Sequence, residues 1–475
     1  MPTFCRWRSP SGNDLLLVYQ KDYGEDEVLP DGKTVVSINF TGDNHGPHSY
    51  ERVKKIYADL RKRYPQAQLV GASFNDVARE LLLIKKDLPV VTSEIGDTWI
   101  FGYGGAPIRM AKFRAVSRLY SQWLNEGKIK KDSDVALDFA AELGLIAEHT
   151  QGVDVKTHLR QWDKYDMDKF LKGRSEGIFS MAEASWKEID NYIDSAIAFL
   201  PASLQKEARE VVAEVDKVKL EDNSKMKPMA RKRWEQPIAG GMTLAGLSYQ
   251  MFDGDDYDDF QNRYLRARYE WALDDLGKRG LKESHAVSVT LYAQTMAQSV
   301  RKEKKGTRII TELRFPENEK VDKRVYPERI QVNCFTTKNG KRSEMALTIY
   351  GKPAVRLPES YWLSFTVPGI ESVIAEKMGE RVNLMDVVEK GNRQMHGIDR
   401  YVDLITSGET IRISSKEAFL LNVGEAQGLN YSTNYPDKRK GVHFNLNNNL
   451  WGTNFSMWNE GSLTYHFVIE TLSRK

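Results

Sequence analysis

Polar side chains gather in a short loop, residues 41–49, that follows a predicted strand. The loop reads TGDNHGPHS and carries an acid, an amide and two imidazoles: Asp43, Asn44, His45 and His48. Carboxyl and imidazole groups at one turn are suited to proton transfer or to binding a polar ligand. The structural alternative is that Asn44 or Ser49 caps the next helix and that Gly46 makes a turn. That alternative explains the small residues but not an acid and two histidines together, so we favour a functional role for this loop.

A second loop of the same kind follows the strand predicted at residues 88–93. Residues 92–105 read TSEIGDTWIFGYGG and place two carboxylates beside three aromatic rings: Glu94, Asp97, Trp99, Phe101 and Tyr103. Aromatic faces pack on the apolar faces of sugars while carboxylates accept hydrogen bonds from the hydroxyls, so this composition favours a carbohydrate site. The alternative, that Glu94 caps a turn and Trp99 belongs to a core, stays open. The GYGG run lacks the spacing of a dinucleotide fingerprint.

Histidines stand out in two further segments. Residues 148–162 read EHTQGVDVKTHLRQW at the end of a predicted helix, with these polar groups: His149, Asp154, Lys156 and His158. A histidine beside a glycine break at a helix end is suited to binding a metal ion, although such a histidine also caps helices or packs in a core. Residues 441–458, with His443, Trp451 and Trp458, predict either a ligand surface or aromatic packing between asparagine-rich turns.

The elements around the first two loops determine what those loops can do together. Short apolar runs predict strands at residues 15–19, 34–40, 67–73 and 88–93, and amphipathic spacing predicts helices at 49–64 and 74–85. Strands separated by single helices are typical of a parallel sheet, in which ligands bind at the carboxyl ends of the strands. Both acid-bearing loops follow such strands. Glycosidases need two carboxyl groups flanking one bond, so the pairing favours that chemistry.

The sequence pattern of the rest of the chain changes twice, first to helical spacing and then to β-rich segments. Apolar residues recur at spacings of three and four in residues 111–124, 135–149, 181–200 and 258–276, which predicts a helical bundle. After the charged run RKEKKG, which ends at Gly306, β-rich segments alternate with Gly, Asn and Pro turns and favour a β-sandwich. The predicted fold is therefore multidomain, with a partial parallel α/β domain at residues 1–106, a helical bundle at 107–305 and a β-sandwich at 306–475.

Composition excludes several classes of protein. The 475 residues carry 69 Lys and Arg against 66 Asp and Glu, a balance too small to indicate a nucleic-acid or anionic-membrane surface. The two cysteines, Cys5 and Cys334, exclude a disulfide framework and a thiolate zinc module. No apolar run approaches the roughly 20 residues that cross a bilayer, and the first residues lack the apolar core of a secretory signal. The chain as given is predicted to be soluble, with its compartment undecided.

Three motifs carry a resemblance to a known family. The order of the three regions, together with TGDNHGPHSYERVKKIYADL, SEIGDTWIFGYGG and AELGLIAEHTQGVDV, resembles the family 38 glycoside hydrolases, the retaining α-mannosidases. The wider pattern EIGDTW, EHTxGxDVK and HFNLxNNxWGTNF is more similar still to a group of microbial proteins related to those mannosidases. The resemblance covers nearly the full chain. It implies retaining, metal-assisted cleavage of a glycosidic bond.

The resemblance also implies residue roles. Asp43 is the candidate acid/base or sugar-binding carboxylate, and the expected substrate-binding residues are Asn44, His45, Glu94, Asp97, Trp99 and Tyr103. The family's His-Asp motif at a helix end, whose histidine binds zinc, maps onto His149, but Thr150 replaces the aspartate. The implied cofactor is zinc and the implied partner is a carbohydrate.

One departure from the family shapes the expected activity. No His-x-Asp sequence occurs in the chain, and the family's other zinc ligands and its nucleophile belong to strands that precede the region resembling FCRWRSP. We therefore expect an enzyme that lacks the first part of its α/β domain, holds zinc weakly and self-associates through an exposed sheet edge; a signal peptide lost with that part stays an open alternative. Two rival interpretations are a non-catalytic carbohydrate-binding or structural protein, and a half-enzyme completed by a separate partner.

Overall fold

The computed structural model describes residues 1–20, 24–42, 45–96, 98–229, 233–239, 243–265 and 268–473. The chain divides into two compact units, Met1–Ile95 and Gly96–Lys475, which are described separately here. The second unit contains both the predicted helical region and the predicted β-rich region.

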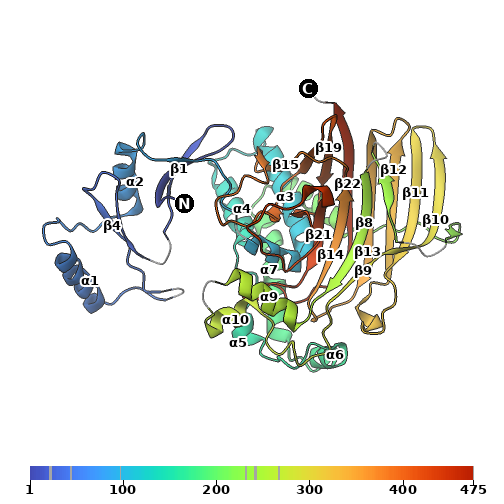
Figure 1. The fold of residues 1–475 in the computed structure, drawn as a ribbon, viewed down its shortest axis with the longest axis horizontal. Helices are drawn as coiled ribbons and strands as arrows, with labels where there is room; N and C mark the ends of the chain where they lie inside the picture. Colours follow the sequence, from blue (N-terminus) through green and yellow to red (C-terminus); the bar gives the residue numbers. More distant parts are fainter. Residues whose placement is uncertain are drawn as a thin grey trace. The chain divides into compact units, whose positions relative to one another are not determined.

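The first unit contains a small mixed sheet. Among the described residues its strand order is β2-β1-β5, with β1 antiparallel to β2 and parallel to β5. A separate antiparallel hairpin, β3-β4, lies outside this sheet. The elements of this unit are β1 (Phe4–Arg8), β2 (Asp14–Val18), β3 (Asp26–Val28), β4 (Val35–Ser37), α1 (Tyr50–Arg63), α2 (Phe74–Leu83) and β5 (Val90–Val91), drawn in blue in Figure 1.

Serine caps begin both helices of this unit. The Ser49 side chain accepts a hydrogen bond from the backbone N–H of Arg52, which begins α1 as the capping alternative proposed. The backbone N–H of Ser73 donates to Asp76 over 2.7 Å at the start of α2. The helices predicted at residues 49–64 and 74–85 thus form nearly where their sequence patterns place them.

The structure contains strands in three of the four segments predicted to form them. Residues 15–19, 34–40 and 88–93 contain β2, β4 and β5, but residues 67–73 form no strand in the structure. Val70 in that segment is 70% exposed. The prediction of a strand there is wrong because an apolar run becomes a strand only when a neighbouring backbone pairs with it. The sheet is mixed, and β4 pairs with β3 outside it, so the two acid-bearing loops do not follow neighbouring parallel strands.

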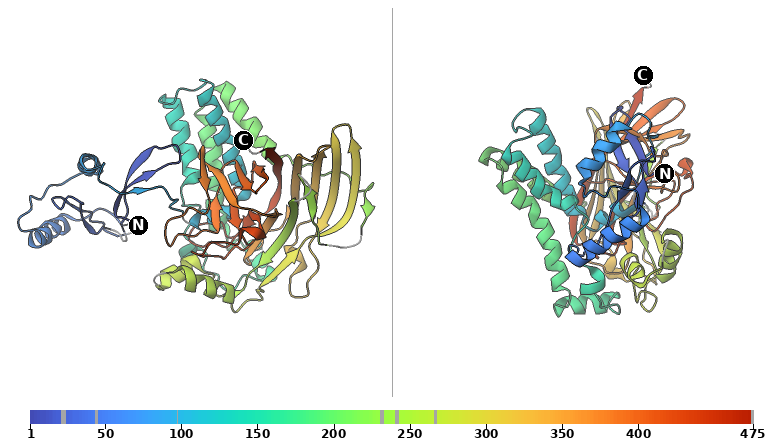
Figure 2. Two further views of the ribbon diagram at one scale, coloured as in Figure 1. Left: turned by 45° about the horizontal axis from the view of Figure 1, so that its top comes forward. Right: turned by 90° about the vertical axis from the view of Figure 1, so that its left-hand side faces the viewer.

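Long helices dominate the start of the second unit. α3, α4, α7 and α8 pack against one another in pairs, as the cyan to green ribbons of Figure 2 show. Shorter helical segments connect them or follow them. The helices of this unit are η1 (Thr98–Gly105), α3 (Pro107–Asn125), α4 (Asp134–Gly144), η2 (Leu145–Ala147), α5 (Val155–His158), α6 (Met167–Ser175), α7 (Ser180–Ala198), α8 (Ala202–Asp216), α9 (Gly254–Tyr264), α10 (Glu270–Leu276), η3 (Lys323–Val325) and η4 (Lys438–Lys440).

Two large antiparallel sheets make up the rest of the second unit. Within the described ranges, the larger sheet has ten strands and the smaller has seven. The larger has the order β16 (Glu380–Asn383), β15 (Ser372–Lys377), β18 (Tyr401–Ile405), β19 (Glu409–Ser415), β22 (Gly461–Ser473), β13 (Arg342–Lys352), β12 (Arg329–Thr337), β11 (Gly306–Arg314), β10 (Gln294–Glu303) and β6 (Lys227–Pro228). The smaller has the order β17 (Met395–Gly397), β20 (Leu420–Val423), β21 (Val442–Asn448), β14 (Glu359–Thr366), β8 (Thr243–Met251) and β7 (Gln236–Ile238), with β9 (Val289–Tyr292) paired to β8.

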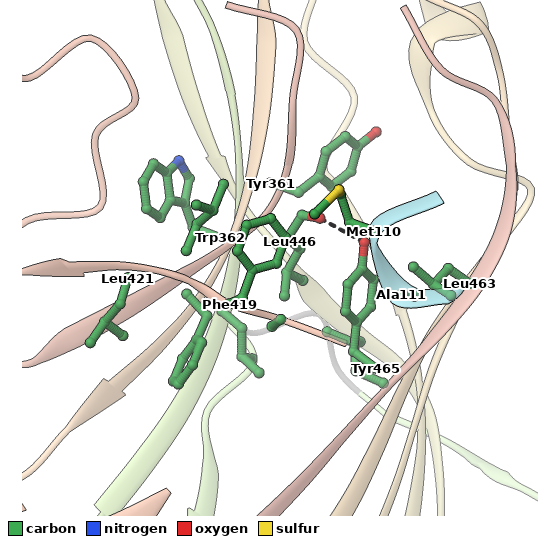
Figure 3. Close-up of a cluster of buried hydrophobic side chains, with 14 of the residues drawn as sticks. Met110, Ala111, Tyr361, Trp362, Phe419, Leu421, Leu446, Leu463 and Tyr465 are labelled. Carbon is green, nitrogen blue, oxygen red and sulfur yellow. Dashed lines mark hydrogen bonds between the residues drawn. The ribbon is translucent and has the colours of Figure 1, made fainter. Parts of the chain in front are cut away.

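Buried side chains join the two sheets into a sandwich. Phe467 of β22 contacts Phe365 and Phe444 of the smaller sheet, with ring centroids 5.7 and 5.2 Å apart. The Tyr465 hydroxyl donates to the Leu446 carbonyl over 2.7 Å, and Figure 3 shows this bond beside Met110 and Ala111 of α3. One hydrophobic cluster therefore runs from the helices into both sheets.

The segment after α8 differs from its prediction. Residues 227–303 were expected to be helical, yet they contain strands β6 to β10 as well as α9 and α10. The charged run at residues 301–306 forms the tip of the β10–β11 hairpin, where lysines are exposed to solvent. The charge therefore marks a turn between paired strands. The division into three domains stays a prediction.

Candidate functional site

The 3₁₀ segment η1 positions two of the predicted sugar-binding side chains, Trp99 and Tyr103. The Asn448 amide donates to the Phe101 carbonyl over 2.9 Å and holds η1 against β21. A Cβ on Gly102 would lie 2.4 Å from the ring of Phe455, so only glycine allows this approach. The glycines of the GYGG run therefore serve close packing, in agreement with the absence of a dinucleotide fingerprint.

Aromatic rings from four parts of the sequence form a continuous row, which we call the aromatic row. Its successive ring centroids are 5.6, 6.2, 5.8 and 5.2 Å apart. The His149 side chain is 61% exposed at one end, and Trp451 is almost fully buried in the middle. The row consists of His149, Trp99, Trp451, Tyr264 and Tyr431, of which Trp99, Tyr264 and Tyr431 are partly exposed.

Tyr103 is connected to the row through Phe455, whose ring contacts both Tyr103 and Trp99. The hydroxyl of Tyr103 donates to the Ala147 carbonyl over 2.7 Å, and its ring contacts Phe455 edge to face. Burial, with a smaller effect of the charge of Glu148, raises the pKa of Tyr103 to about 12. The hydroxyl therefore stays protonated as a donor at neutral pH, so Tyr103 fixes η1 to η2.

His149 is paired with a carboxylate at the end of η2. Its Nδ1 contacts Oε1 of Glu148, and the backbone N–H of Thr150 donates to Oε2 of the same group over 2.8 Å. Burial acts to raise the pKa of Glu148, but the hydrogen bonds from Thr150 and the nearby imidazole outweigh it, so the pKa lies below its usual value. Glu148 is thus an ionised acceptor at neutral pH, and Thr150 orients it.

A buried network holds this loop from behind. The Gln151 amide donates to the carbonyls of Ile146 and Glu148, both over 2.8 Å, and its oxygen accepts from Arg109 over 2.9 Å. Arg109 is 4% exposed and also donates to Asp190 over 2.6 Å. Since a buried guanidinium with several fixed partners has one orientation, α3 and α7 together set the position of the loop that carries His149.

Gly152 shows how closely α7 approaches the same loop. Its φ of +153° is unfavourable for a side chain, and a Cβ there would lie 2.5 Å from the Trp186 ring. The Ser185 hydroxyl accepts from the backbone N–H of Val153 over 3.1 Å. The loop after His149 is therefore constrained on both sides.

The residues around His149 do not fit the zinc site that the family resemblance implies. Catalytic zinc takes three protein ligands, and here Glu148 is the acidic partner of His149 while Thr150 replaces the family's aspartate. Across the part of the chain that the structure describes, no group of three or more His, Cys, Asp or Glu side chains is arranged to hold a metal ion. We derive no chemical step through a metal.

The remaining predicted site residues fall either outside the described residues or in the first unit. Asp43, Asn44 and Asp97 lie outside the described residues. His45 and Glu94 belong to the first unit, where His45 is exposed and Glu94 is half-buried. The structure thus brings together Trp99, Tyr103 and His149 within the second unit.

Neighbouring candidates have structural roles. The Lys156 ammonium lies between Asp154 and Asp275, at 3.0 and 2.9 Å, and joins α5 to α10. Among the remaining candidates, His158 is exposed on α5, and Trp458 packs in a core with Trp186. Aromatic packing is therefore the better interpretation of Trp458, whereas Trp451 belongs to the aromatic row.

The sequence reasoning missed two members of the row, Tyr264 and Tyr431. Each lies in a segment without a motif, and only the fold brings Tyr264 to Trp451 and Tyr431 to Tyr264. The signal that was present was the WGTNF stretch, which supplies both Trp451 and Phe455. Nothing in the sequence linked Arg109 to Gln151, 42 residues later.

Comparisons with known proteins give one family and a group of similar structures. A domain of unknown function, DUF5054, matches residues 104–236, and no curated protein matches the sequence. Similar solved structures include a protein in glycosyl hydrolase family 38 from Enterococcus faecalis, 10% identical with a TM-score of 0.45. Another is an alpha-mannosidase from Enterococcus faecalis V583, 8% identical with a TM-score of 0.47. Each match covers 99% of this chain and 69% of the other.

The first of these structures is named for the family whose motifs the sequence resembles. In the described part of the chain, no helix has the length and apolar character needed to span a bilayer.

Proposed function

We propose that this protein is an α-mannosidase-like glycoside hydrolase in its architecture and that its aromatic row binds the carbohydrate. The observation that carries the proposal is the row itself, in which partly exposed rings lie beside the ionised carboxylate of Glu148. Sugars present apolar faces to aromatic rings and hydroxyl hydrogens to carboxylates, so this combination suits a saccharide.

Each residue has a proposed part in binding. Trp99 provides the ring on which a sugar face packs, and Glu148 accepts a hydroxyl hydrogen. His149 lies at the solvent end of the row, where its imidazole also reaches a hydroxyl group. Tyr103 acts only by positioning η1, because its hydroxyl is used by Ala147.

The described residues around the row support binding better than cleavage. Retaining hydrolysis needs two carboxyl groups about 5 Å apart, one of them protonated. Glu148 is the carboxylate beside His149, and its lowered pKa makes it a poor acid. Asp43 remains our proposed acid/base, with Asn44, His45, Glu94 and Asp97 as proposed substrate contacts. Non-catalytic carbohydrate binding is therefore the second candidate function.

A binding experiment tests the first part of the proposal. Calorimetric titration of the full chain with α-linked mannobiose should show binding that weakens about tenfold in Trp99→Ala, equivalent to about 1.4 kcal/mol. The matched control is Trp271→Ala, because Trp271 of α10 is 59% exposed and outside the row. Equal loss in both variants, or no binding by the natural chain, would contradict the proposal.

Turnover and zinc binding test the second part. We expect no hydrolysis of an aryl α-mannoside by the purified chain, since retaining cleavage needs a protonated carboxyl group about 5 Å from a second one, and Glu148, the carboxylate beside His149, is ionised. Turnover that Asp43→Asn abolishes would establish catalysis instead. Zinc should bind weakly in calorimetry, and submicromolar binding that survives His149→Ala would show that the metal site lies elsewhere.

A further inference from the structure

A concave surface lies in the second unit, apart from the aromatic row. A cleft of about 640 Å³ opens between α3, α7, α8 and the loop before β22. We call it the α3–α7 cleft. It shares no lining residue with the aromatic row, and its volume is within the usual range for ligand sites.

One side of the cleft is a rigid apolar wall. Trp186 and Trp458 meet edge to face with ring centroids 4.7 Å apart, and both are almost fully buried. The Trp458 indole N–H donates to Glu183 over 3.1 Å, which fixes its ring. Ile108 continues the wall on α3. A ligand that enters the cleft therefore meets a preformed apolar surface.

Two arginines at the edges, Arg174 and Arg109, are already paired with carboxylates that also line the cleft. Arg174 donates to Glu183 over 2.7 Å and to both oxygens of Glu460 over 2.6 and 3.1 Å. Arg109 is paired with Asp190. These pairs hold α6, α7 and the loop before β22 in place without a ligand.

Two polar side chains of α7 remain available at the rim. Lys187 and Asn191 are exposed, line the cleft and are four residues apart, so they lie on the same face of the helix. Neither makes a side-chain hydrogen bond or ion pair with any described residue. They present an ammonium donor and an amide that both donates and accepts.

Charge decides which class of ligand fits. Cationic and anionic side chains line the cleft in equal number, so the lining carries no net charge that would favour an anion or a cation. A neutral ligand with many hydroxyl groups matches this lining, because each hydroxyl both donates and accepts. Its C–H faces would pack on the apolar wall.

We propose that the α3–α7 cleft is a second carbohydrate-binding site, which takes a short neutral oligosaccharide. The C–H groups of the sugar pack against Ile108, Trp186 and Trp458, and its hydroxyls bond to Lys187 and Asn191. The proposed site does not involve the aromatic row. An experiment can therefore refute this proposal without refuting the function proposed above, and the reverse.

The test observes the cleft directly by methyl NMR of the full chain. Isoleucine δ1-methyl groups are labelled, since Ile108 and Ile193 line the cleft while Ile309 of β11 lies outside it. Neutral trisaccharides of mannose, glucose and galactose are titrated, with inorganic phosphate as the anionic probe. We expect at least one trisaccharide to shift the Ile108 and Ile193 signals and not that of Ile309.

Variants separate the two sites. Lys187→Ala combined with Asn191→Ala should weaken the cleft titration at least tenfold, whereas Trp99→Ala should leave it unchanged. Lys172→Ala is the matched control, because this lysine of α6 is exposed outside the cleft. No shift with any sugar, a shift produced only by phosphate, or a sugar-induced shift that Trp99→Ala removes would overturn the proposal.

Discussion

Two helices with similar amphipathic patterns, α1 in the first unit and α7 in the second, are stabilised in different ways. α1 buries none of its residues, although Ile56, Tyr57 and Leu60 lie on one face. α7 buries six residues, among them Trp186 and Ile193. The same periodicity therefore produces a helix in both places, but only α7 gains the roughly 1.5–3 kcal/mol that each large buried side chain contributes.

The two units differ in the same way as their helices. The core of the first unit is small and consists of Phe4, Leu29, Val36, Leu81 and Leu88. Large apolar side chains of this unit remain in solvent, including Phe74 at 73% and Leu83 at 80% exposure. The core of the second unit runs from α3 through both sheets. Regular elements alone do not make a unit stable, so we expect the first unit to open far more readily.

The largest expected effect is a difference in hydrogen exchange between the units. Residues 15–40 should exchange several orders of magnitude faster than β13, β14, β21 and β22, because opening free energies follow local burial. The two buried cysteines offer a second measurement, since Cys5 lies in the first unit and Cys334 in the second. Burial raises the pKa of both thiols, that of Cys334 to about 11, so each reacts mainly after opening.

Faster labelling of Cys5 than of Cys334 would agree with the exchange data. Uniform protection in a monomeric protein would contradict the comparison, and with it the expected self-association through residues 15–40.

Truncating one core side chain in each unit tests whether the two units unfold independently. Phe444→Ala should cost the second unit about 3–5 kcal/mol, since Phe444 is fully buried between Phe365 and Phe467. Labelling of Cys334 should accelerate at least a hundredfold while Cys5 labelling is unchanged. Leu81→Ala is the reciprocal variant, because it truncates one of the five buried side chains of the hydrophobic cluster that the described residues of the first unit form, and it should affect Cys5 alone. A change at both thiols in either variant would mean that the units unfold together.

Protonation of one buried histidine, His443, should lower the free energy of unfolding of the second unit at acid pH. His443 is buried on β21, and burial lowers its pKa to about 4, against a weaker opposing effect of a backbone bond to Gly424 and the charge of Glu425. The unfolded chain binds a proton near pH 6.5 that the folded chain binds only near pH 4. The stability from this group is therefore complete above about pH 6.5 and is lost as the pH falls towards 4, by about 3 kcal/mol.

Variants isolate this histidine from the carboxylates that titrate nearby. In thermal unfolding between pH 7 and 4.5, His443→Gln should reduce the pH dependence of the second unit relative to the natural chain. His45→Gln, in the exposed loop of the first unit, serves as the control and should leave that dependence intact. An unchanged slope in His443→Gln would refute this role.

Local signals predicted most of the elements because periodicity and caps act within a few residues. Ser49 begins α1, and β14 (Glu359–Thr366) lies in the β-rich region predicted after Gly306. Residues 67–73 failed because strand formation depends on a partner that the local sequence does not specify. The charged run at residues 301–306 does not distinguish a domain boundary from a hairpin tip, because exposed charge is common to both.

The candidate site was only partly visible for a similar reason. Trp99 and Tyr103 share one motif, and His149 was suggested by its family-like segment. Trp451 is about 350 residues from Trp99 in sequence yet 6.2 Å away between rings. Its place in the row depends on tertiary structure, which composition and spacing do not encode.

The smallest expected effect compares one helix cap in each unit. Ser49 caps α1 and Ser133 caps α4, each through its side-chain oxygen and a backbone N–H three residues later. Replacing either serine with alanine should cost about 1 kcal/mol locally. α4 also buries Ala136, Phe139 and Leu143, so we expect it to keep its slow hydrogen exchange in Ser133→Ala. α1 has no buried residue to compensate, and its residues should exchange about fivefold faster in Ser49→Ala. Equal changes in the two helices would show that α1 is held by contacts as extensive as those of α4, and the contrast between the units would then need another physical cause.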